Sequence, residues 1–310
     1  MSAKDNAWGP AHEIGHIHQL AIDWPSSTES SNNLFSNFIL YKLGKYCSRG
    51  TELNLPKAAD NRTTNSEGNI TGMTLSEAHC VLNRPWCNFG SNYQGENTEL
   101  HMRMNWQLWN YYHRCGHKTD FWQRLFKLMR ENRTSSNNPG VKQLLFARMA
   151  SEAAQEDLTE FFEMWGFFVT VDTQIDQYGS YQYTVTKEMI ENAKKAMAKY
   201  PKKAKPFYYL EDRKKGDIGL DTTPPDVGHY TQFQRIRPIT KDIKGNINGR
   251  EVSITNGDEA VAFELREKDA NGKLLYFSTF IKFEVPLTVS LTYAKLYAVQ
   301  ADGKRILLEE

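Results

Sequence analysis

The pattern HExxH near the start of the chain, formed by His12, Glu13 and His16, constrains this protein more than any other feature of its sequence. On a helix, residues four apart share one face, so the two imidazoles can bind one metal ion while Glu13 borders its open coordination position. Pro10 stands where the first turn of a helix tolerates proline. The pattern therefore predicts a helix that carries a zinc site able to activate a water molecule.

The remaining residues of this helix are expected to hold it against the core. Ile14, Ile17 and Leu20 predict an apolar face beside the metal-binding face. The alternative interpretation is a solvated helix with incidental histidines, because a five-residue pattern also arises by chance. His18 lies on another face than His16 and is not expected to bind the metal.

A catalytic zinc ion takes three protein ligands, and the sequence offers two carboxylates for the third position. The segment from Ser27 or Thr28 to about Leu43 is predicted as a second helix, with Glu29 in its first turn. A carboxylate there suits the helix dipole and can approach the histidines from a neighbouring helix. Glu29 is therefore the expected third ligand. Asp23 is the alternative ligand, and a plain carboxylate at a helix N-terminus is the alternative role for Glu29.

Asn33 follows Glu29 by four residues and so lies on the same helical face. Metal-bound imidazoles usually donate their second ring N–H to an oxygen acceptor. We expect the Asn33 amide to supply that oxygen to His12 or His16, and an ordinary exposed polar residue is the alternative interpretation.

Peptide hydrolysis at such a site needs a base, and Glu13 would take the proton of the activated water and pass it to the leaving amine. A second electrophile that faces the developing oxyanion is also usual. Its candidates, among which the sequence does not decide, are Tyr93, His101, Arg103 and His113. Helical periodicity in their segment favours core packing for most of these side chains.

Four tryptophans are further candidates for contact with a ligand, since their rings could stack on sugars. They are Trp86, Trp106, Trp109 and Trp122. Aromatic residues make up 12% of the chain, so core packing is the favoured interpretation for them.

Two segments together resemble the enhancin-like and mucin-degrading zinc metallopeptidases, metallopeptidase family sixty. The first is WGPAHEIGHIHQ followed by TESSNNLFSN, in which HExxH is followed after a variable gap by a glutamate, here Glu29. The second is EDLTEFFEMWGF at residues 156–167, which is similar to the segment that closes the catalytic domain of that family. The resemblance frames residues from about 8 to 170 and is weaker in the C-terminal third.

The resemblance implies a gluzincin in which His12, His16 and Glu29 bind Zn²⁺ and Glu13 acts as general base and acid. It also implies glycoprotein substrates, namely mucins and other O-glycosylated proteins cut beside a sugar-bearing Ser or Thr, and a secreted or cell-surface location. Zincin-type peptidases place a sheet-containing subdomain before the HExxH helix, whereas here the motif begins at residue 12. The expectation is that the chain is the C-terminal portion of a longer precursor, truncated at its N-terminus.

Composition limits the other partners of the chain. A formal net charge of +1 argues against a nucleic-acid partner, and no segment approaches the roughly 20 apolar residues of a membrane span. The basic run at 194–205 is expected to be a solvated linker rather than a binding patch. The sequence does not indicate an oligomeric state.

Four cysteines are too few and too irregularly spaced for a disulfide-built scaffold or a cysteine zinc site. They are Cys47, Cys80, Cys87 and Cys115. A pair between Cys80 and Cys87 and free buried thiols both remain open.

The expected fold class is α+β, in two domains. Residues 1–225 are predicted as a mainly helical, gluzincin-type catalytic domain, with helices at 100–130, 139–150 and 157–165. From about residue 228 the period-two alternation predicts a small antiparallel β-sandwich, residues 226–310, as an accessory domain. Its expected strands include 252–254, 261–265 and 274–283, and its expected hairpin joins 295–301 to 304–308 through Asp302-Gly303.

The sequence is compatible with three functions. The leading one is a zinc endopeptidase for glycosylated proteins. The second is a non-catalytic glycan-binding or adhesin fragment that retains the metal-binding helix. The third is a general gluzincin peptidase without a glycan requirement.

Overall fold

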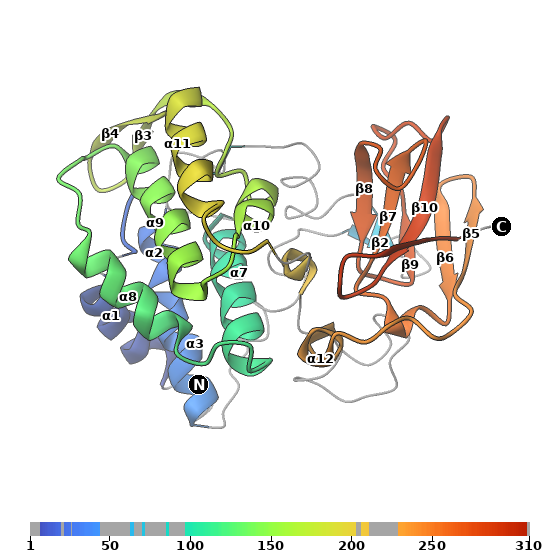
Figure 1. Cartoon of the computed structure of the whole chain (residues 1–310), viewed down its shortest axis with the longest axis horizontal. Coiled ribbons are helices and arrows are strands. Elements are labelled where there is room, and N and C mark those ends of the chain that lie inside the picture. Colours follow the sequence, from blue (N-terminus) through green and yellow to red (C-terminus); the bar gives the residue numbers. More distant parts are fainter. Residues whose placement is uncertain are drawn as a thin grey trace.

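The computed structural model describes residues 7–19, 22–25, 27–43, 63–64, 70–71, 85–86, 97–202, 206–210 and 229–308. Helices dominate the first two thirds of the chain and antiparallel strands the last third, and the two parts lie side by side (Figure 1). The predicted α+β class is confirmed.

The helical part is built from short helices and one two-stranded hairpin. Its helices are α1 (Trp8–His18), α2 (Thr28–Ser31), α3 (Asn33–Lys42), α7 (Asn97–Trp109), α8 (Phe121–Glu131), α9 (Pro139–Ala154), α10 (Thr159–Met164) and α11 (Lys187–Met197). A π-helical turn, Asn110–Arg114, follows α7, and a 3₁₀ turn, Phe207–Tyr209, leads toward α12 (His229–Arg235).

Local sequence accounts for the limits of α9. Asn138 precedes the helix and its side-chain oxygen accepts from the Gly140 N–H at 2.9 Å, while Pro139 takes the first helical position. The helix ends where Gln155 turns to a φ of +58°. It therefore runs four residues beyond the predicted 139–150.

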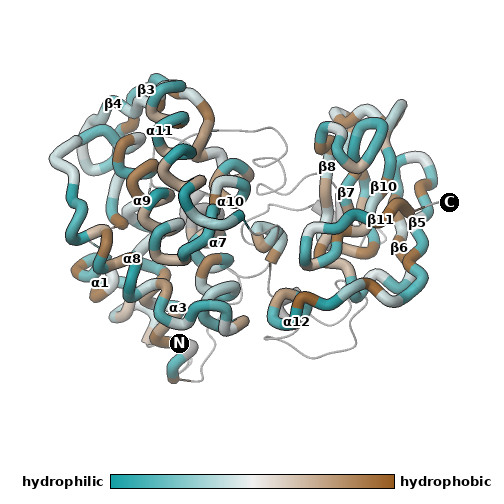
Figure 2. The backbone as a smooth tube through the Cα atoms, viewed as in Figure 1, coloured by the Kyte–Doolittle hydropathy of each residue, from teal (hydrophilic) through white to brown (hydrophobic). Residues whose placement is uncertain are grey.

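The predicted helix at 100–130 is wrong in one respect, because it is two helices. Gly116, with a φ of +81°, lies in the connection after the π-helical turn, where the chain leaves the helical conformation. The second of the two, α8, buries Phe121, Leu125 and Met129 on one side, and Figure 2 colours hydrophobic and hydrophilic residues along this helix. The predicted helix at 157–165 corresponds to α10.

The predicted apolar face of α1 is also wrong. Ile14 and Ile17 are 47% and 67% exposed, and Ala11 and Gly15 are the residues that α1 buries. A Cβ on Gly15 would lie 2.6 Å from the backbone oxygen of Asn32. The helix therefore packs through small residues, which let its backbone approach α3 closely.

A hairpin that the sequence analysis did not predict lies between α10 and α11. Its strands, β3 (Val171–Asp176) and β4 (Ser180–Val185), are antiparallel, and β4 packs against α9. The helix α11 then occupies the start of the basic run predicted as a linker. Lys194 lies in this helix and pairs with Glu163 at 2.8 Å, so the linker interpretation is wrong for that residue.

The strand part contains two antiparallel sheets that share one core. One sheet has the order β5 (Lys244–Asn248), β6 (Glu251–Thr255), β9 (Lys282–Glu284). The other has the order β11 (Arg305–Leu307), β10 (Ala294–Val299), β7 (Ala262–Glu267), β8 (Leu274–Ser278). Val252, Phe263, Leu265, Phe283 and Leu296 meet in the core between the sheets.

Two strand predictions have different outcomes. The predicted hairpin of 295–301 and 304–308 is confirmed as the β10–β11 pair. The predicted single strand 274–283 is wrong, since it divides into β8 and β9, which belong to different sheets. The chain turns between them after Ser278, whose hydroxyl accepts from the Phe280 N–H at 3.2 Å.

The boundary predicted near residue 225 lies outside the described residues. The described chain resumes with α12, so strand structure begins at β5 rather than near residue 228.

The short pair β1 (Thr63–Thr64) and β2 (Ile70–Thr71) precedes the helices α7–α11 in sequence, but β2 lies against β9 of the strand part (Figure 1).

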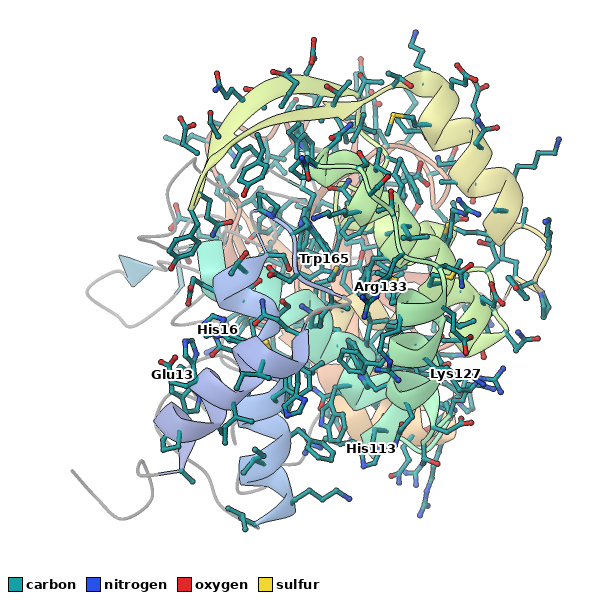
Figure 3. The ribbon with its side chains drawn as sticks, turned by 90° about the vertical axis from the view of Figure 1, so that its left-hand side faces the viewer. Glu13, His16, His113, Lys127, Arg133 and Trp165 are labelled. Carbon is teal, nitrogen blue, oxygen red and sulfur yellow. The ribbon has the colours of Figure 1, made fainter. Side chains whose placement is uncertain are left out.

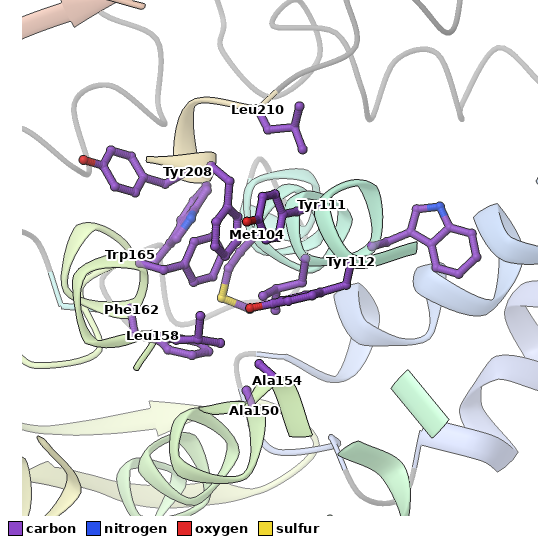
Figure 4. Packing of buried hydrophobic residues seen from close by; sticks show 14 of the residues in the cluster. Met104, Tyr111, Tyr112, Ala150, Ala154, Leu158, Phe162, Trp165, Tyr208 and Leu210 are labelled. Carbon is purple, nitrogen blue, oxygen red and sulfur yellow. The ribbon is translucent and has the colours of Figure 1, made fainter. Parts of the chain in front are cut away.

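An aromatic core fills the helical part and continues into the strand part. Met104, Tyr111, Phe162 and Trp165 pack together with the 3₁₀ turn (Figure 4), and the same cluster includes Val261, Phe277 and Val299. Next to it, the Tyr209 hydroxyl donates to the buried carboxylate of Glu264 at 2.6 Å. The two parts are therefore joined by apolar packing and by a buried hydrogen bond.

Two further predictions concern membrane-spanning segments and the cysteines. Among the residues that the structure describes, no helix is both long and apolar enough to span a membrane. Cys115 is buried, while Cys47, Cys80 and Cys87 lie outside the described residues.

Candidate metal centre

The helix α1 presents His12 and His16 one turn apart on the same face. Their ring centroids are 5.0 Å apart and the ring planes are nearly perpendicular, at 86°. The Trp8 ring stacks on His12 at a centroid distance of 4.9 Å. One imidazole is thus supported by an aromatic neighbour, and both remain partly accessible, with 16% and 30% of their side chains exposed.

The structure brings Glu29, in the first turn of α2, to these two histidines. Its Oε2 lies 3.5 Å from His12 Nε2 and 3.6 Å from His16 Nε2. Within the described part of the chain, these three side chains form the group whose ligand atoms all lie within 4.8 Å of one another. Asp23, the alternative ligand, instead accepts from the Thr28 hydroxyl at 2.7 Å.

Asn33 connects the histidine and the glutamate. Its Oδ1 lies 2.7 Å from His12 Nδ1, and its Nδ2 donates to the Glu29 backbone oxygen at 2.9 Å. Because an amide oxygen can only accept, this contact favours the tautomer with the proton on Nδ1, in which Nε2, 3.5 Å from Glu29 Oε2, is unprotonated. This is the arrangement that a metal-binding histidine requires.

Asn32 is a residue at this site that the sequence analysis did not identify. Its Nδ2 lies 3.0 Å from His12 Nε2 and 3.0 Å from His16 Nε2, and its side chain is fully buried. Its Oδ1 has no hydrogen-bond partner within the described residues. The amide nitrogen thus faces the two Nε2 atoms that are the candidate metal ligands. The only sequence signal was the Asn32-Asn33 doublet after Glu29.

Tyr178 is the second residue that the sequence analysis missed. It lies at the turn of the β3–β4 hairpin, and its hydroxyl donates to Glu29 Oε1 at 2.7 Å. The two residues are 149 positions apart. The available signal was a tyrosine next to a glycine, between two segments of alternating polarity. This signal predicts a turn, but it does not show that the turn contacts Glu29.

Glu13, the predicted base, is exposed on α1. Figure 3 shows its side chain near that of His16. His18 is directed elsewhere, with its ring 6.1 Å from that of Phe35. The structure therefore separates His18 from the group formed by His12, His16 and Glu29.

The candidates for an oxyanion-binding group differ in burial and in whether the structure describes them. Arg103 is buried, and His113 stacks on Trp109 at 4.1 Å in an apolar pocket, where burial lowers its pKa. Tyr93 and the side chain of His101 lie outside the described residues.

The four tryptophans that were predicted to pack in the core are all buried. Trp86, Trp106, Trp109 and Trp122 are each 7% exposed or less.

The donor set fits a zinc ion. Two imidazole nitrogens and one carboxylate oxygen are the ligands of one class of catalytic zinc site. Donors about 2.1 Å from a common tetrahedral ion lie about 3.4 Å from one another, close to the separations from Glu29 to the two histidines.

Comparison with protein families gives two matches. A family model described as peptidase M60, enhancin and enhancin-like, matches residues 1–166. A second model, described as the peptidase M60 C-terminal domain, matches residues 242–307. The first includes α1 and α2, and the second coincides with most of the strand part.

Similar proteins include solved metallopeptidases. One, in complex with the Tn antigen, is 56% identical with a TM-score of 0.80, and the similarity covers 99% of this chain and 55% of that one. Another, from Bacteroides thetaiotaomicron, is 56% identical with a TM-score of 0.81 and is covered to 50%. A TRPM8 channel-associated factor homolog from Xenopus laevis is 28% identical over 171 residues, which are 52% of this chain and 15% of that protein. The chain therefore spans about half the length of the similar solved chains and less of the curated relative.

Proposed function

Because the chain belongs to the peptidase M60 family of enhancin and enhancin-like proteins, we propose that it is a zinc-dependent endopeptidase that hydrolyses peptide bonds in O-glycosylated, mucin-like proteins. The observation that carries this proposal is the convergence of His12, His16 and Glu29 from two adjacent helices. The helix α1 carries two of these proposed ligands, and α2 carries the third in its first turn.

In this proposal His12 Nε2, His16 Nε2 and Glu29 Oε2 hold the zinc ion. When bound, zinc lowers the pKa of water to about 7 and polarises the carbonyl of the scissile bond. Asn33 keeps His12 in the required tautomer through the 2.7 Å contact with its Nδ1. The Asn32 amide nitrogen lies next to both Nε2 atoms, which are the proposed metal ligands. The Asn32 side chain therefore has to turn away from the imidazoles when the ion binds.

Glu13 acts as the general base and acid. It lies next to His12 in sequence and is exposed, so its carboxylate can receive a proton from water and deliver it to the leaving amine. Its carboxylate is not one of the three proposed ligands, and its removal should therefore leave the ion bound.

The substrate class follows from similarity. One of the similar metallopeptidases, 56% identical, was solved in complex with the Tn antigen, and the similarity covers 99% of the present chain. We infer that this protein also recognises glycosylated substrates and acts outside the cell or at its surface. We further propose that residues 1–225 form the catalytic domain and residues 226–310 an accessory domain, as the separate core of the strand part supports.

The test compares the wild-type chain with Glu13→Ala. Both proteins should bind near-stoichiometric zinc, while cleavage of a mucin substrate should fall by about 10²–10⁴-fold in the variant, the usual contribution of general acid–base catalysis. Chelation of the ion should abolish wild-type cleavage, and added zinc should restore it. Undiminished cleavage by Glu13→Ala would refute the assignment of the base, and retention of mucin without cleavage by the wild type would favour a glycan-binding protein.

A matched pair of peptides tests the glycan requirement. One peptide carries a single O-linked sugar on Thr, and the other has the same sequence without it. Cleavage of the glycosylated peptide alone is expected. Equal cleavage of both peptides would identify a general peptidase.

A further inference from the structure

The turn that carries Tyr178 combines backbone strain with exposure. Tyr178 has a φ of +52°, a region that bulky residues rarely adopt, and its side chain is 65% exposed. The Gln177 N–H donates to the Gly179 oxygen at 2.8 Å, which closes a tight turn around the tyrosine. A strained residue that packing does not bury points to a functional constraint.

The root of the hairpin is fixed by the core, so the turn has a defined position. Tyr183 and Val185 of β4 are buried against α9, and the Tyr183 hydroxyl donates to Gln143. The Asn138 side chain accepts from the Thr184 N–H at 3.0 Å and donates to the Thr184 oxygen at 2.9 Å. The hairpin therefore extends from a rigid base to Glu29.

The two carboxylate oxygens of Glu29 have separate partners. Oε2 faces the imidazoles of His12 and His16, while Oε1 accepts from Tyr178 at 2.7 Å. Asn33 holds the backbone oxygen of the same residue. Glu29 is thus fixed at its backbone by the first residue of α3 and at its side chain by the hairpin.

We propose that Tyr178 is a positioning residue for the proposed zinc ligand Glu29. Its hydroxyl engages Oε1, so that the carboxylate presents Oε2 alone to the cation and a coordination position stays available for water. This inference rests on the proposed function, because it assumes that Glu29 binds the metal. It adds a contribution to the metal centre from a segment that follows α10 in the chain.

The test uses the full chain and measures metal binding rather than turnover. The metal-free wild type, Tyr178→Phe and the control Tyr181→Phe, which loses a hydroxyl from the same hairpin, are titrated with Zn²⁺ in competition with a chromophoric chelator. We expect Tyr178→Phe to bind zinc about 10–100-fold more weakly, the usual effect of removing a partner of a metal ligand, and the control to match the wild type. The visible spectrum of bound Co²⁺ should change in Tyr178→Phe alone, because a freed Oε1 raises the coordination number.

A third variant separates positioning from support of the turn. Tyr178→Gly relieves the positive φ but also removes the hydroxyl, so positioning predicts weak zinc binding, as in Tyr178→Phe. Wild-type affinity and Co²⁺ spectrum in both Tyr178 variants would overturn this inference and leave the proposed function intact. Failure of the wild type to bind zinc would overturn both.

Discussion

Glu29 and Glu264 each accept a hydrogen bond from a tyrosine hydroxyl, but they lie in opposite surroundings. Tyr178 donates to Glu29 at 2.7 Å, and the Glu29 side chain keeps 21% of its surface exposed. Tyr209 donates to Glu264 at 2.6 Å, and Glu264 is fully buried in the strand part. The same bond therefore occurs once at the surface of the helical part and once inside the protein.

The difference lies in the positive charge that each carboxylate meets. Glu264 accepts from Arg266 and from Arg305, whose Nε lies 2.5 Å away. Burial acts to raise the pKa of the Glu264 carboxyl, but the hydrogen bonds from the two guanidinium groups outweigh it and hold the pKa below its usual 4.5. Glu29 Oε2 instead faces imidazole nitrogens that are able to bind a cation. The Glu264 carboxylate is already paired with two guanidinium groups of the protein, whereas the Glu29 carboxylate would receive its positive charge from the proposed metal ion.

The largest expected effect comes from removing the charge of Glu264. Glu264→Gln leaves the guanidinium groups of Arg266 and Arg305, which are 13% and 22% exposed, without their carboxylate partner, which should cost about 3 kcal/mol of unfolding free energy. Urea denaturation measures this loss, and zinc affinity of the folded variant should not change. The control Glu267→Gln, partly exposed on the same strand, should stay within about 0.5 kcal/mol of the wild type. A stable Glu264→Gln protein would remove the distinction drawn between the two clusters.

Glu29→Gln should give the opposite profile. It removes a proposed ligand, so zinc affinity should fall by more than about 100-fold, or about 2.7 kcal/mol, beyond the usual effect of an outer-sphere change. The unfolding free energy of the metal-free protein should barely change, because the side chain is partly exposed and an amide oxygen still accepts from Tyr178. Isothermal titration with Zn²⁺ measures the first quantity and urea denaturation the second. Asp23→Asn is the matched control, and loss of zinc binding in that variant instead would reverse the choice between the two carboxylates.

Asn33→Ala sharpens the comparison within the metal centre. The amide orients His12 without being a proposed ligand, so its loss should weaken zinc binding by about 10–100-fold. Asn33→Asp keeps an oxygen acceptor for the His12 N–H and should recover much of the affinity. The tautomer of His12, followed by NMR of the imidazole nitrogens, should shift from Nδ1–H only in the alanine variant. Equal zinc affinity in all three proteins would show that Asn33 is only a helix residue.

The sequence could predict the part of the site that local geometry determines. Helical spacing placed His12 and His16 on one face, and the predicted start of α2 placed Glu29 in a first turn. Tyr178 could not be found in this way, because its partner lies 149 residues away and the hairpin that carries it was not predicted. Asn32 likewise becomes visible only when α1 and α3 are packed together at Gly15.

The fold was predictable to a similar degree. Turn signals at Asp302-Gly303 located the β10–β11 hairpin, since those residues favour a tight reversal. The separation of β8 from β9 was not predictable, because alternation continues across 274–283 and only tertiary pairing assigns the two strands to different sheets. Ile14 and Ile17 suggested a buried face by composition, but the close approach at Gly15 oriented α1 differently.

Tyr209→Phe tests the buried cluster with the smallest expected effect. The variant loses one hydrogen bond, but Glu264 Oε1 still has Arg305 Nη2 at 3.3 Å, so the cost should be about 1 kcal/mol of unfolding free energy at pH 7. Because the folded pKa of Glu264 is lowered, the stability from its ionised form is complete above about pH 4.5 and is lost as the pH falls through the folded value. The difference between wild type and Tyr209→Phe should therefore shrink in acid, as urea denaturation at a series of pH values would show. A difference that stays constant across this range would mean that the contribution of the Tyr209 hydroxyl does not depend on the charge of Glu264, so that the two tyrosine–glutamate pairs would share a geometry but not a role.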